Sequence, residues 1–222
     1  MPTSEVGATP GDIKASATSS RERILLAAKH LFARNGYENT STVAIARDAG
    51  TSESQLMKHF GSKQGLLLAI LDRGWMCILE RVRELHDEAS LPDRLLGMLE
   101  AMVVESEKDQ ELKELMALET RRVGKDSRDV LISRGYVQFV ELFDTVLSEM
   151  RSHEQVRADL DLEAVRAALI GMTESLLRDQ VVAKRSELRA SYSFEELRRL
   201  LEVLSPALAG GAVSPAAERI RA

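Results

Sequence analysis

Proline is nearly absent from the interior of this 222-residue chain. Pro2 and Pro10 stand near its start, Pro206 and Pro215 near its end, and Pro92 is the only proline between them. Because proline disrupts helix interiors, the two long stretches on either side of Pro92 permit continuous helices. Leu, Ala, Glu and Arg, all good helix formers, are abundant there, and no convincing run alternates polar with β-branched residues. We therefore predict an all-α protein.

Capping residues and apolar spacing set the expected limits of the helices. The expected N-terminal caps are Ser19 and Ser52, each completing a capping box with a residue three positions later (Glu22 and Gln55), together with Asp161 and Ser193. The ranges predicted to be helical are Ser20–Arg34, Ser41–Ala49, Glu53–Phe60, Ser62–His86, Asp93–Glu107, Gln110–Val123, Ser127–Arg151, Leu162–Val182 and Phe194–Leu204.

Composition limits the class of protein further. Hydrophobic residues make up 44% of the chain and charged residues 29%, as in ordinary globular proteins. Cys77 is the single cysteine, so no intrachain disulfide can form. No apolar run approaches the roughly 18 residues of a membrane span, and the first twenty residues lack the apolar stretch of a secretory signal. We expect a cytoplasmic protein with no membrane partner.

Two short predicted helices flank Ala49-Gly50-Thr51, a turn with glycine at its centre. This arrangement is typical of a helix-turn-helix. Ile45-Ala46 supplies the apolar and small residues needed where the helices cross, and Gly50 can adopt the positive φ of the turn. Leu56 and Phe60, four residues apart, are expected to anchor the second helix inward.

A longer series of motifs surrounds this turn in one order. They are Arg23-Ile24-Leu25-Leu26-Ala27-Ala28, Leu31-Phe32, Gly36-Tyr37, Ile45-Ala46, Ala49-Gly50, Leu56, His59-Phe60, Ser62-Lys63 and Leu66-Leu67. The series resembles the N-terminal domain of the tetracycline-repressor (TetR/AcrR) family of transcriptional regulators. Met57 departs from it, since the family usually has tyrosine there beside the DNA backbone, and Ser54 replaces a common glycine.

The resemblance implies that the second helix of the motif enters the major groove of double-stranded DNA. Gln55 and Ser54 are the best candidates for contacts with base edges, because glutamine can pair with adenine through two bonds. Cations, and hydroxyls at a helix start, are suited to phosphate. The full set of predicted DNA-binding residues is Ser41, Thr42, Thr51, Ser52, Ser54, Gln55, Lys58, His59 and Lys63.

Charge is divided unevenly along the chain, whose total of −5 is unusual for a nucleic-acid-binding protein. Residues 1–65 hold eight Lys and Arg against six Asp and Glu, a net charge of +2, which leaves −7 for the remainder. The segment that carries the motif is therefore mildly basic, and the charge that matters to DNA is local.

The resemblance also implies that the later helices bind a small-molecule effector and pair two copies of the chain into a homodimer, which would place two heads on a palindromic operator. Two faces suit such pairing. One is a small-residue stripe on the helix predicted at 162–182 (Ala164, Ala168, Gly171 and Ser175), and the other is the leucine-rich last helix (Leu197, Leu200, Leu201, Leu204 and Leu208). Packing within a monomer core is the alternative for both.

Methionine and aromatic side chains in the middle helices can line an adaptable apolar pocket. These candidates are Trp75, Met98, Met102, Met116, Tyr136, Phe139, Phe143 and Met172. Ordinary core packing is the alternative for each. We expect a partly apolar effector and no cofactor.

The predicted domains are a disordered tail (1–18), a three-helix DNA-binding domain (19–65), a helical ligand-binding and dimerisation bundle (66–208) and a flexible tail (209–222). The chain is expected to be a repressor released from its operator by a small molecule. An enzyme is not expected, because no Glu-x-x-His, phosphate-binding glycine loop or Gly-x-Ser-x-Gly occurs. A helical ligand-binding or adaptor protein without DNA binding is the alternative that Met57 and Ser54 leave open.

Overall fold

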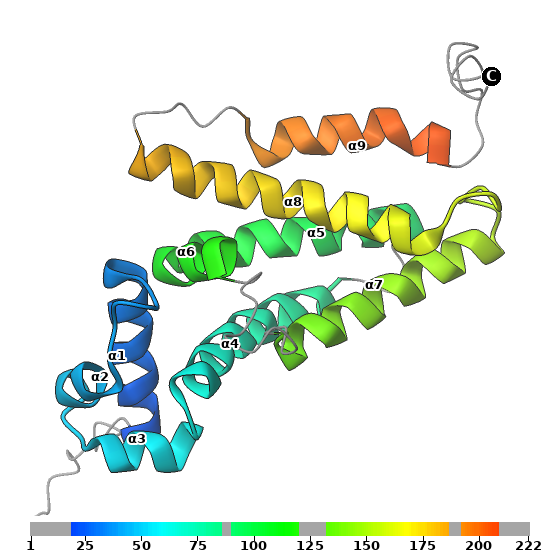
Figure 1. Ribbon diagram of the computed structural model, residues 1–222. Helices are drawn as coiled ribbons and strands as arrows, with labels where there is room; N and C mark the ends of the chain where they lie inside the picture. The colour runs from blue at the N-terminus through cyan, green and yellow to red at the C-terminus, as the bar shows by residue number, and fades with distance from the viewer. Residues whose placement is uncertain (1–18, 86–89, 120–131, 187–191, 209–222) are drawn as a thin grey trace, which may run out of the picture.

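In the computed structural model, residues 19–85, 90–119, 132–186 and 192–208 are described. These residues form nine helices and no strand, which confirms the all-α prediction (Figure 1). The helices are α1 (Ser20–Asn35), α2 (Thr42–Asp48), α3 (Glu53–Phe60), α4 (Lys63–Arg83), α5 (Leu91–Lys108), α6 (Gln110–Glu119), α7 (Arg134–Ser152), α8 (Leu162–Arg185) and α9 (Phe194–Leu208). The predicted tails, 1–18 and 209–222, lie outside the described residues.

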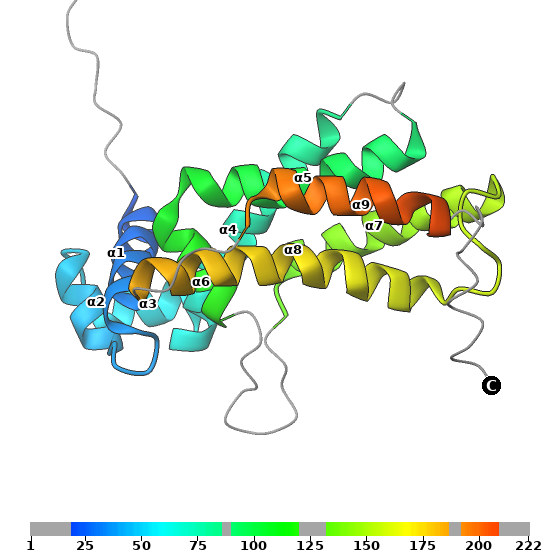
Figure 2. The same ribbon diagram turned by 90° about the horizontal axis from the view of Figure 1, so that it is seen from above.

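The helices divide into a head and a body. The head consists of α1, α2 and α3, which pack against one another at one end of the molecule (Figure 1). Helix α4 leaves the head and runs into the body, where it packs on α5 and α7. Helices α8 and α9 lie side by side over the body in both views, and α8 covers α5, α6 and α7 (Figures 1 and 2). One apolar core continues from α1 to α8, so the head is packed onto the body rather than tethered to it.

Most helix limits follow the predicted caps. Helix α3 has the predicted bounds, and Ser19 and Asp161 accept hydrogen bonds from Glu22 N (3.2 Å) and Ala164 N (2.9 Å) as expected. The capping box at Ser19 is only half formed, because the Glu22 carboxylate turns away to pair with Arg73 of α4.

Several helix limits differ from the prediction by a few residues, and two of the largest differences are at the start of α7 and the end of α9. Helix α7 begins at Arg134 rather than Ser127, since Ser133 caps it by accepting from Tyr136 N at 3.2 Å. Residues 127–131 of the predicted range lie outside the described part of the chain. Helix α9 continues beyond Leu204 to Leu208, whose carbonyl accepts a hydrogen bond from Arg157 N at 2.8 Å. This bond ties the end of α9 to the turn between α7 and α8.

Candidate nucleic-acid interface and its junction with the body

The turn between α2 and α3 has the backbone that the motif requires. Gly50 has φ +62°, the left-handed conformation for which glycine was expected. The turn is closed by hydrogen bonds from Ala49 N to Ile45 O and from Thr51 N to Ala46 O, each 2.9 Å. The helix-turn-helix geometry therefore follows from the position of one glycine and from ordinary helix termination.

Apolar anchors fix α3 against the rest of the head. Ile45 and Leu56 are fully buried, as predicted. Phe60 is only half-buried, and the Arg21 guanidinium lies 5.1 Å from its ring centroid. Arg23 Nε donates to Ala49 O at 3.1 Å, which holds the turn against α1. The orientation of α3 is thus set by apolar packing and by two arginines of α1, one at Phe60 and one at the turn.

The opposite face of α3 is open to solvent. Ser54, Gln55, Lys58 and His59 are all exposed, and Met57 has 42% of its surface exposed. This is the face that the sequence assigned to DNA. It carries hydroxyl, amide and cationic groups around one methionine, a combination that can contact both base edges and phosphates.

Serine hydroxyls cap both helices at this surface. Ser41 Oγ accepts from Ala44 N at 3.1 Å, and Ser52 Oγ accepts from Gln55 N at 3.2 Å. Because a hydroxyl group donates as well as accepts, each capping serine can still donate its proton to a phosphate oxygen. Thr51, between the two helices, is half-buried.

Two predicted phosphate contacts have partners within the head. The Thr42 hydroxyl donates to the Glu53 carboxylate, a pairing that the sequence analysis missed. The Lys63 ammonium lies 4.3 Å from the Tyr37 ring centroid and donates to Glu38 O at 3.4 Å. Lys63 is therefore held at the start of α4 by the loop between α1 and α2. Such preorganisation reduces the side-chain entropy lost on binding.

Ion pairs join the head to the body. Lys29 Nζ of α1 lies 2.5 Å from Asp109 Oδ2 and 3.7 Å from Glu111 Oε2, and His30 Nδ1 lies 2.6 Å from Glu111 Oε1. Arg185, at the end of α8, donates to Ala33 O at 3.1 Å. Desolvation raises the pKa of Asp109, but hydrogen bonds from Lys29 and the Leu112 amide outweigh it, so the pKa is lowered overall.

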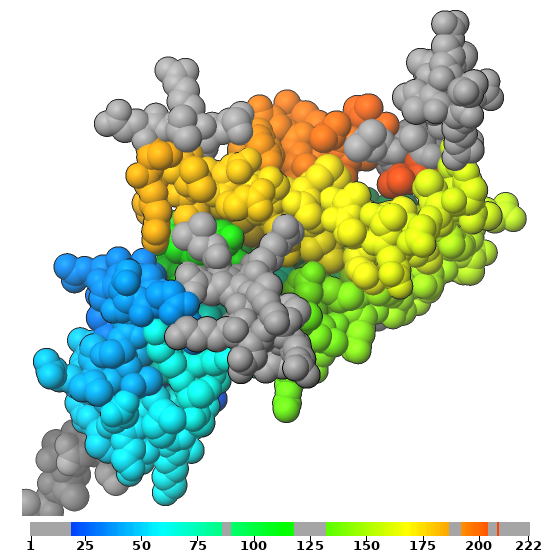
Figure 3. All heavy atoms as spheres, viewed as in Figure 1, coloured from blue at the N-terminus to red at the C-terminus, as the bar shows by residue number. Residues whose placement is uncertain are grey.

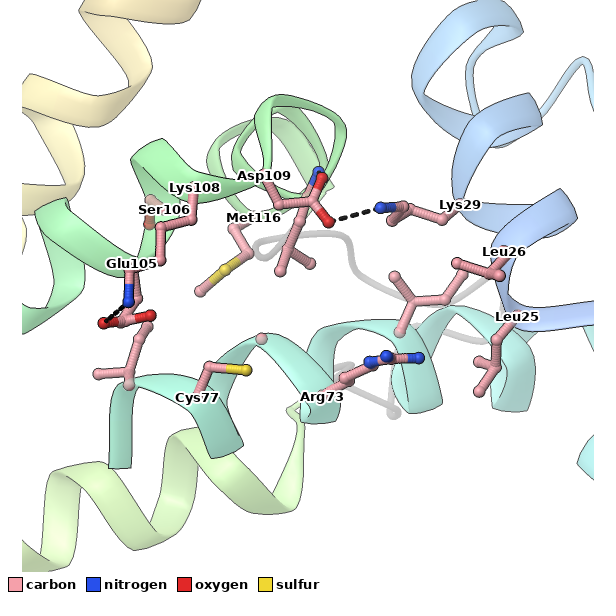
Figure 4. Close-up of a pocket in the computed structure, with 14 residues that line it drawn as sticks. Leu25, Leu26, Lys29, Arg73, Cys77, Glu105, Ser106, Lys108, Asp109 and Met116 are labelled. Atoms are coloured by element: carbon pink, nitrogen blue, oxygen red, sulfur yellow. Dashed lines mark hydrogen bonds and ion pairs between the residues drawn. The ribbon is translucent and has the colours of Figure 1, made fainter. Parts of the chain in front are cut away.

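A crevice of about 280 Å³ lies beside these pairs, between α1, α4, α5 and α6. We call it the junction crevice, and it is lined by Leu25, Leu26, Lys29, Ile70, Arg73, Gly74, Cys77, Ile78, Glu105, Ser106, Lys108, Asp109, Leu112 and Met116. Figure 4 shows Lys29 and Asp109 meeting on one side of it, with Arg73 and Cys77 rising from α4 on the other. Sequence reasoning could not find this site, because residues 29 and 109 are brought together only by the tertiary fold.

The residues of the predicted effector pocket lie in separate places in the structure. Of its eight residues, Met116 lines the junction crevice, and Met98 lines a separate cavity of about 240 Å³ beside Arg94. The other six line neither of these cavities, nor a third cavity of about 380 Å³ between α5, α7, α8 and α9. Three of these six pack against one another in the core with tilted rings, whose centroids are 5.2 Å apart for Trp75 and Phe139 and 6.0 Å apart for Phe139 and Phe143. These three aromatic residues therefore take part in core packing, which was the alternative to a pocket wall.

Of the two faces predicted to pair two copies, the small-residue stripe of α8 points outward, whereas the leucines of α9 are divided between the core and the surface. A Cβ added to Gly171 of α8 would meet no atom within 4 Å, and Ala164 and Ala168 are exposed. On α9, Leu200 is 47% and Val203 73% exposed, while Leu197 is buried against α8. Figure 3 shows α8 and α9 along one side of the body, with the C-terminal end of α8 next to the head. None of the described helices is long and apolar enough to cross a membrane.

The comparisons with known proteins agree with this geometry. Residues 24–70 match the model of the family described as bacterial regulatory proteins, tetR family. The chain is 34% identical over 83 residues to the HTH-type transcriptional repressor AcnR of Corynebacterium glutamicum, covering 37% of this chain and 42% of AcnR. It is 26% identical over 186 residues to the nucleoid occlusion factor SlmA of Photobacterium profundum, covering 83% of this chain and 94% of SlmA.

Solved structures of similar fold extend the likeness to the body. The fatty acid degradation regulator FadR of Bacillus halodurans superposes with a TM-score of 0.68 at 20% identity, over 86% of this chain and 95% of FadR. FadR of Bacillus subtilis, solved in complex with stearoyl-CoA, gives 0.63 at 19% identity, over 86% and 98% of the two chains. At such identities the likeness establishes the fold of head and body together.

Proposed function

Because the chain belongs to the tetR family of bacterial regulatory proteins and is a DNA-binding transcriptional regulator, we propose that it is a repressor. It binds a palindromic operator as a homodimer, and a small-molecule ligand in the body releases it. The observation that carries the proposal is the polar, exposed face of α3. The apolar core that head and body share, together with the Lys29–Asp109 ion pair, fixes the orientation of this face.

The proposed contacts with DNA are of two kinds, those with base edges and those with phosphates. Gln55 and Ser54, exposed near the start of α3, read base edges in the major groove, with Thr51 and Ser52 beside them. Phosphates are held by the ammonium groups of Lys58 and Lys63, by the His59 imidazole and by the hydroxyls of Ser41 and Thr42. Thr42 must share its proton between Glu53 and a phosphate, so we expect it to contribute least.

Pairing of two copies uses α8 and α9. The exposed surfaces of Leu200 and Val203 on α9 and the open small-residue stripe at Ala168 and Gly171 on α8 support this assignment. Small residues allow close helix approach, and apolar burial stabilises the contact. A head with a local charge of only about +2 binds DNA weakly alone, so the dimer supplies the second set of phosphate contacts.

Release by a ligand is supported by the cavities of the body and by a solved relative. FadR of Bacillus subtilis has been crystallised with stearoyl-CoA. In the present chain the head and the body share one core. A ligand that favours another arrangement of the body therefore changes the separation of the two heads.

Selection of bound fragments from a genomic library tests the proposal. The full-length protein should enrich a palindromic sequence at moderate salt, and a ligand that opens the body should reduce the enrichment. If no palindromic sequence is enriched, the adaptor without DNA binding becomes the better account of the chain. Analytical ultracentrifugation of the same preparation tests the dimer.

A further inference from the structure

The junction crevice lies between head and body and uses none of the residues assigned to DNA. We propose that it binds a small amphipathic carboxylate, whose acid group pairs with Arg73 and whose apolar chain lies between α4 and α6. Binding there loosens the head and lowers its affinity for DNA. This last step rests on the proposed function, whereas binding of the ligand does not.

The crevice has the size and the apolar walls for such a ligand. Its volume of about 280 Å³ equals that of about nine water molecules, which suits a ligand of about ten non-hydrogen atoms. Ile70 and Ile78 of α4 and Leu112 and Met116 of α6 contribute apolar surface to its lining. Gly74 lets Leu112 and Met116 of α6 pack closely on α4, since a Cβ there would stand only 2.9 Å from Leu112 Cδ2 and 3.1 Å from Met116 Sδ.

The charges that line the crevice favour an anion. Both lining carboxylates already have lysine partners, with Lys29 at 2.5 Å from Asp109 and Lys108 at 2.8 Å from Glu105. Arg73 is the remaining charge of the lining, and its carboxylate partner, Glu22, is not part of the wall.

Arg73 also has the donors to hold an acid group. Of the five N–H groups of its guanidinium, only one on Nη1 makes a hydrogen bond within the described structure, to Glu22. The side chain is 55% exposed at the edge of the crevice. A ligand carboxylate can therefore form the paired hydrogen bonds that guanidinium groups favour.

Pairing with Arg73 would act directly on the head. Glu22 lies in the first turn of α1, and its bond to Arg73 ties that helix to α4. A bound carboxylate competes with Glu22 for the guanidinium, while its chain separates Leu25 of α1 from the body. The ligand thus weakens the contacts that orient α3, because α1 carries Arg23, which holds the α2–α3 turn.

Cys77 provides a direct measure of occupancy. It is the only cysteine of the chain, it is exposed, and it lines the crevice. The full-length protein is alkylated with iodoacetamide in the presence of octanoate, octanol or octylamine, three probes of equal chain length that differ in charge. Octanoate should slow the alkylation in a saturable manner, octanol should be weaker, and octylamine should have no effect. Equal effects of all three probes, or none from octanoate, would overturn the site.

A pair of variants separates ligand binding from a structural role. Arg73→Gln and Glu22→Gln break the same ion pair, and circular dichroism should show both folded. Arg73→Gln should lose at least tenfold in octanoate affinity. Glu22→Gln should keep or gain affinity, because it removes the competing carboxylate. Equal changes in the two variants would contradict the assignment of Arg73 to the ligand.

The effect on DNA is then measured on the operator recovered by fragment selection. Saturating octanoate should weaken binding of the wild-type protein about tenfold, within the usual range of such coupling, and should leave Arg73→Gln unaffected. Protection of Cys77 without any change in DNA affinity would overturn the coupling but not the site. If no operator is recovered, the proposed function fails, and the alkylation experiment still decides whether the crevice binds carboxylates.

Discussion

Substitution of Gly50 tests whether the positive φ of the turn limits the stability of the helix-turn-helix. Its φ of +62° is unfavourable for residues with a Cβ, yet a Cβ built there meets nothing within 4 Å. The cost of Gly50→Ala is therefore intrinsic to the backbone, about 1–2 kcal/mol for the left-handed conformation. Asparagine tolerates this conformation better than alanine does, so Gly50→Asn should cost less although its side chain is larger.

The predicted order of stability is glycine, then asparagine, then alanine. For a chain of this length, 1 kcal/mol corresponds to about 2–4 °C in Tm, so Gly50→Ala should lower Tm by about 2–8 °C and Gly50→Asn by less. Thermal unfolding followed by circular dichroism measures both, and operator affinity should fall in the same order. If alanine were better tolerated than asparagine, crowding rather than φ would limit this position, and the account of the turn would be wrong.

Three further outcomes follow from the head, the outer helices and the junction. Lys63→Ala should weaken binding to all DNA sequences and lower the salt slope by about one, whereas Gln55→Ala should relax preference at one base pair; identical effects in binding assays would refute the division of roles. Val203→Glu on the exposed face of α9 should shift a dimer to monomer in ultracentrifugation, and an unchanged dimer would exclude this face. Asp109 has a pKa below its ordinary 3.8 when folded, so the stability it gives is present above that pH and is lost as the pH falls through the folded pKa. The difference in unfolding free energy between wild type and Asp109→Asn, from urea titrations, should therefore shrink below pH 3.8, and a constant difference would argue against the Lys29 pair as its source.

Local signals predicted the head almost completely. The turn at Gly50, the burial of Ile45 and Leu56, and the caps at Ser19 and Ser52 depend on neighbours within a few residues, and the structure has them as predicted. The same locality explains the exposed face of α3, because burial of one side of a short helix leaves the other outside.

The body was predicted in outline but not in its cavities. Its helices follow from spacing and caps, yet the space between them depends on which faces meet, and that is decided by the tertiary fold. Trp75 and Phe139 are residue types that often line a pocket, but here their rings pack against each other in the core. The charged wall of the junction crevice contains Arg73 and Asp109, residues that a search for methionine and aromatics passes over.

The bond from Arg185 to Ala33 spans 152 positions of sequence, which has a consequence for how the chain folds during synthesis. The contacts within α1, α2 and α3 are short in sequence, so the head can fold soon after α4 begins to emerge from the ribosome. Its direction relative to the body is fixed only later, first when Asp109 reaches Lys29 and then when the end of α8 arrives. A chain interrupted before α8 would therefore have a folded head but would lack the contact from Arg185 that helps to orient it on the body.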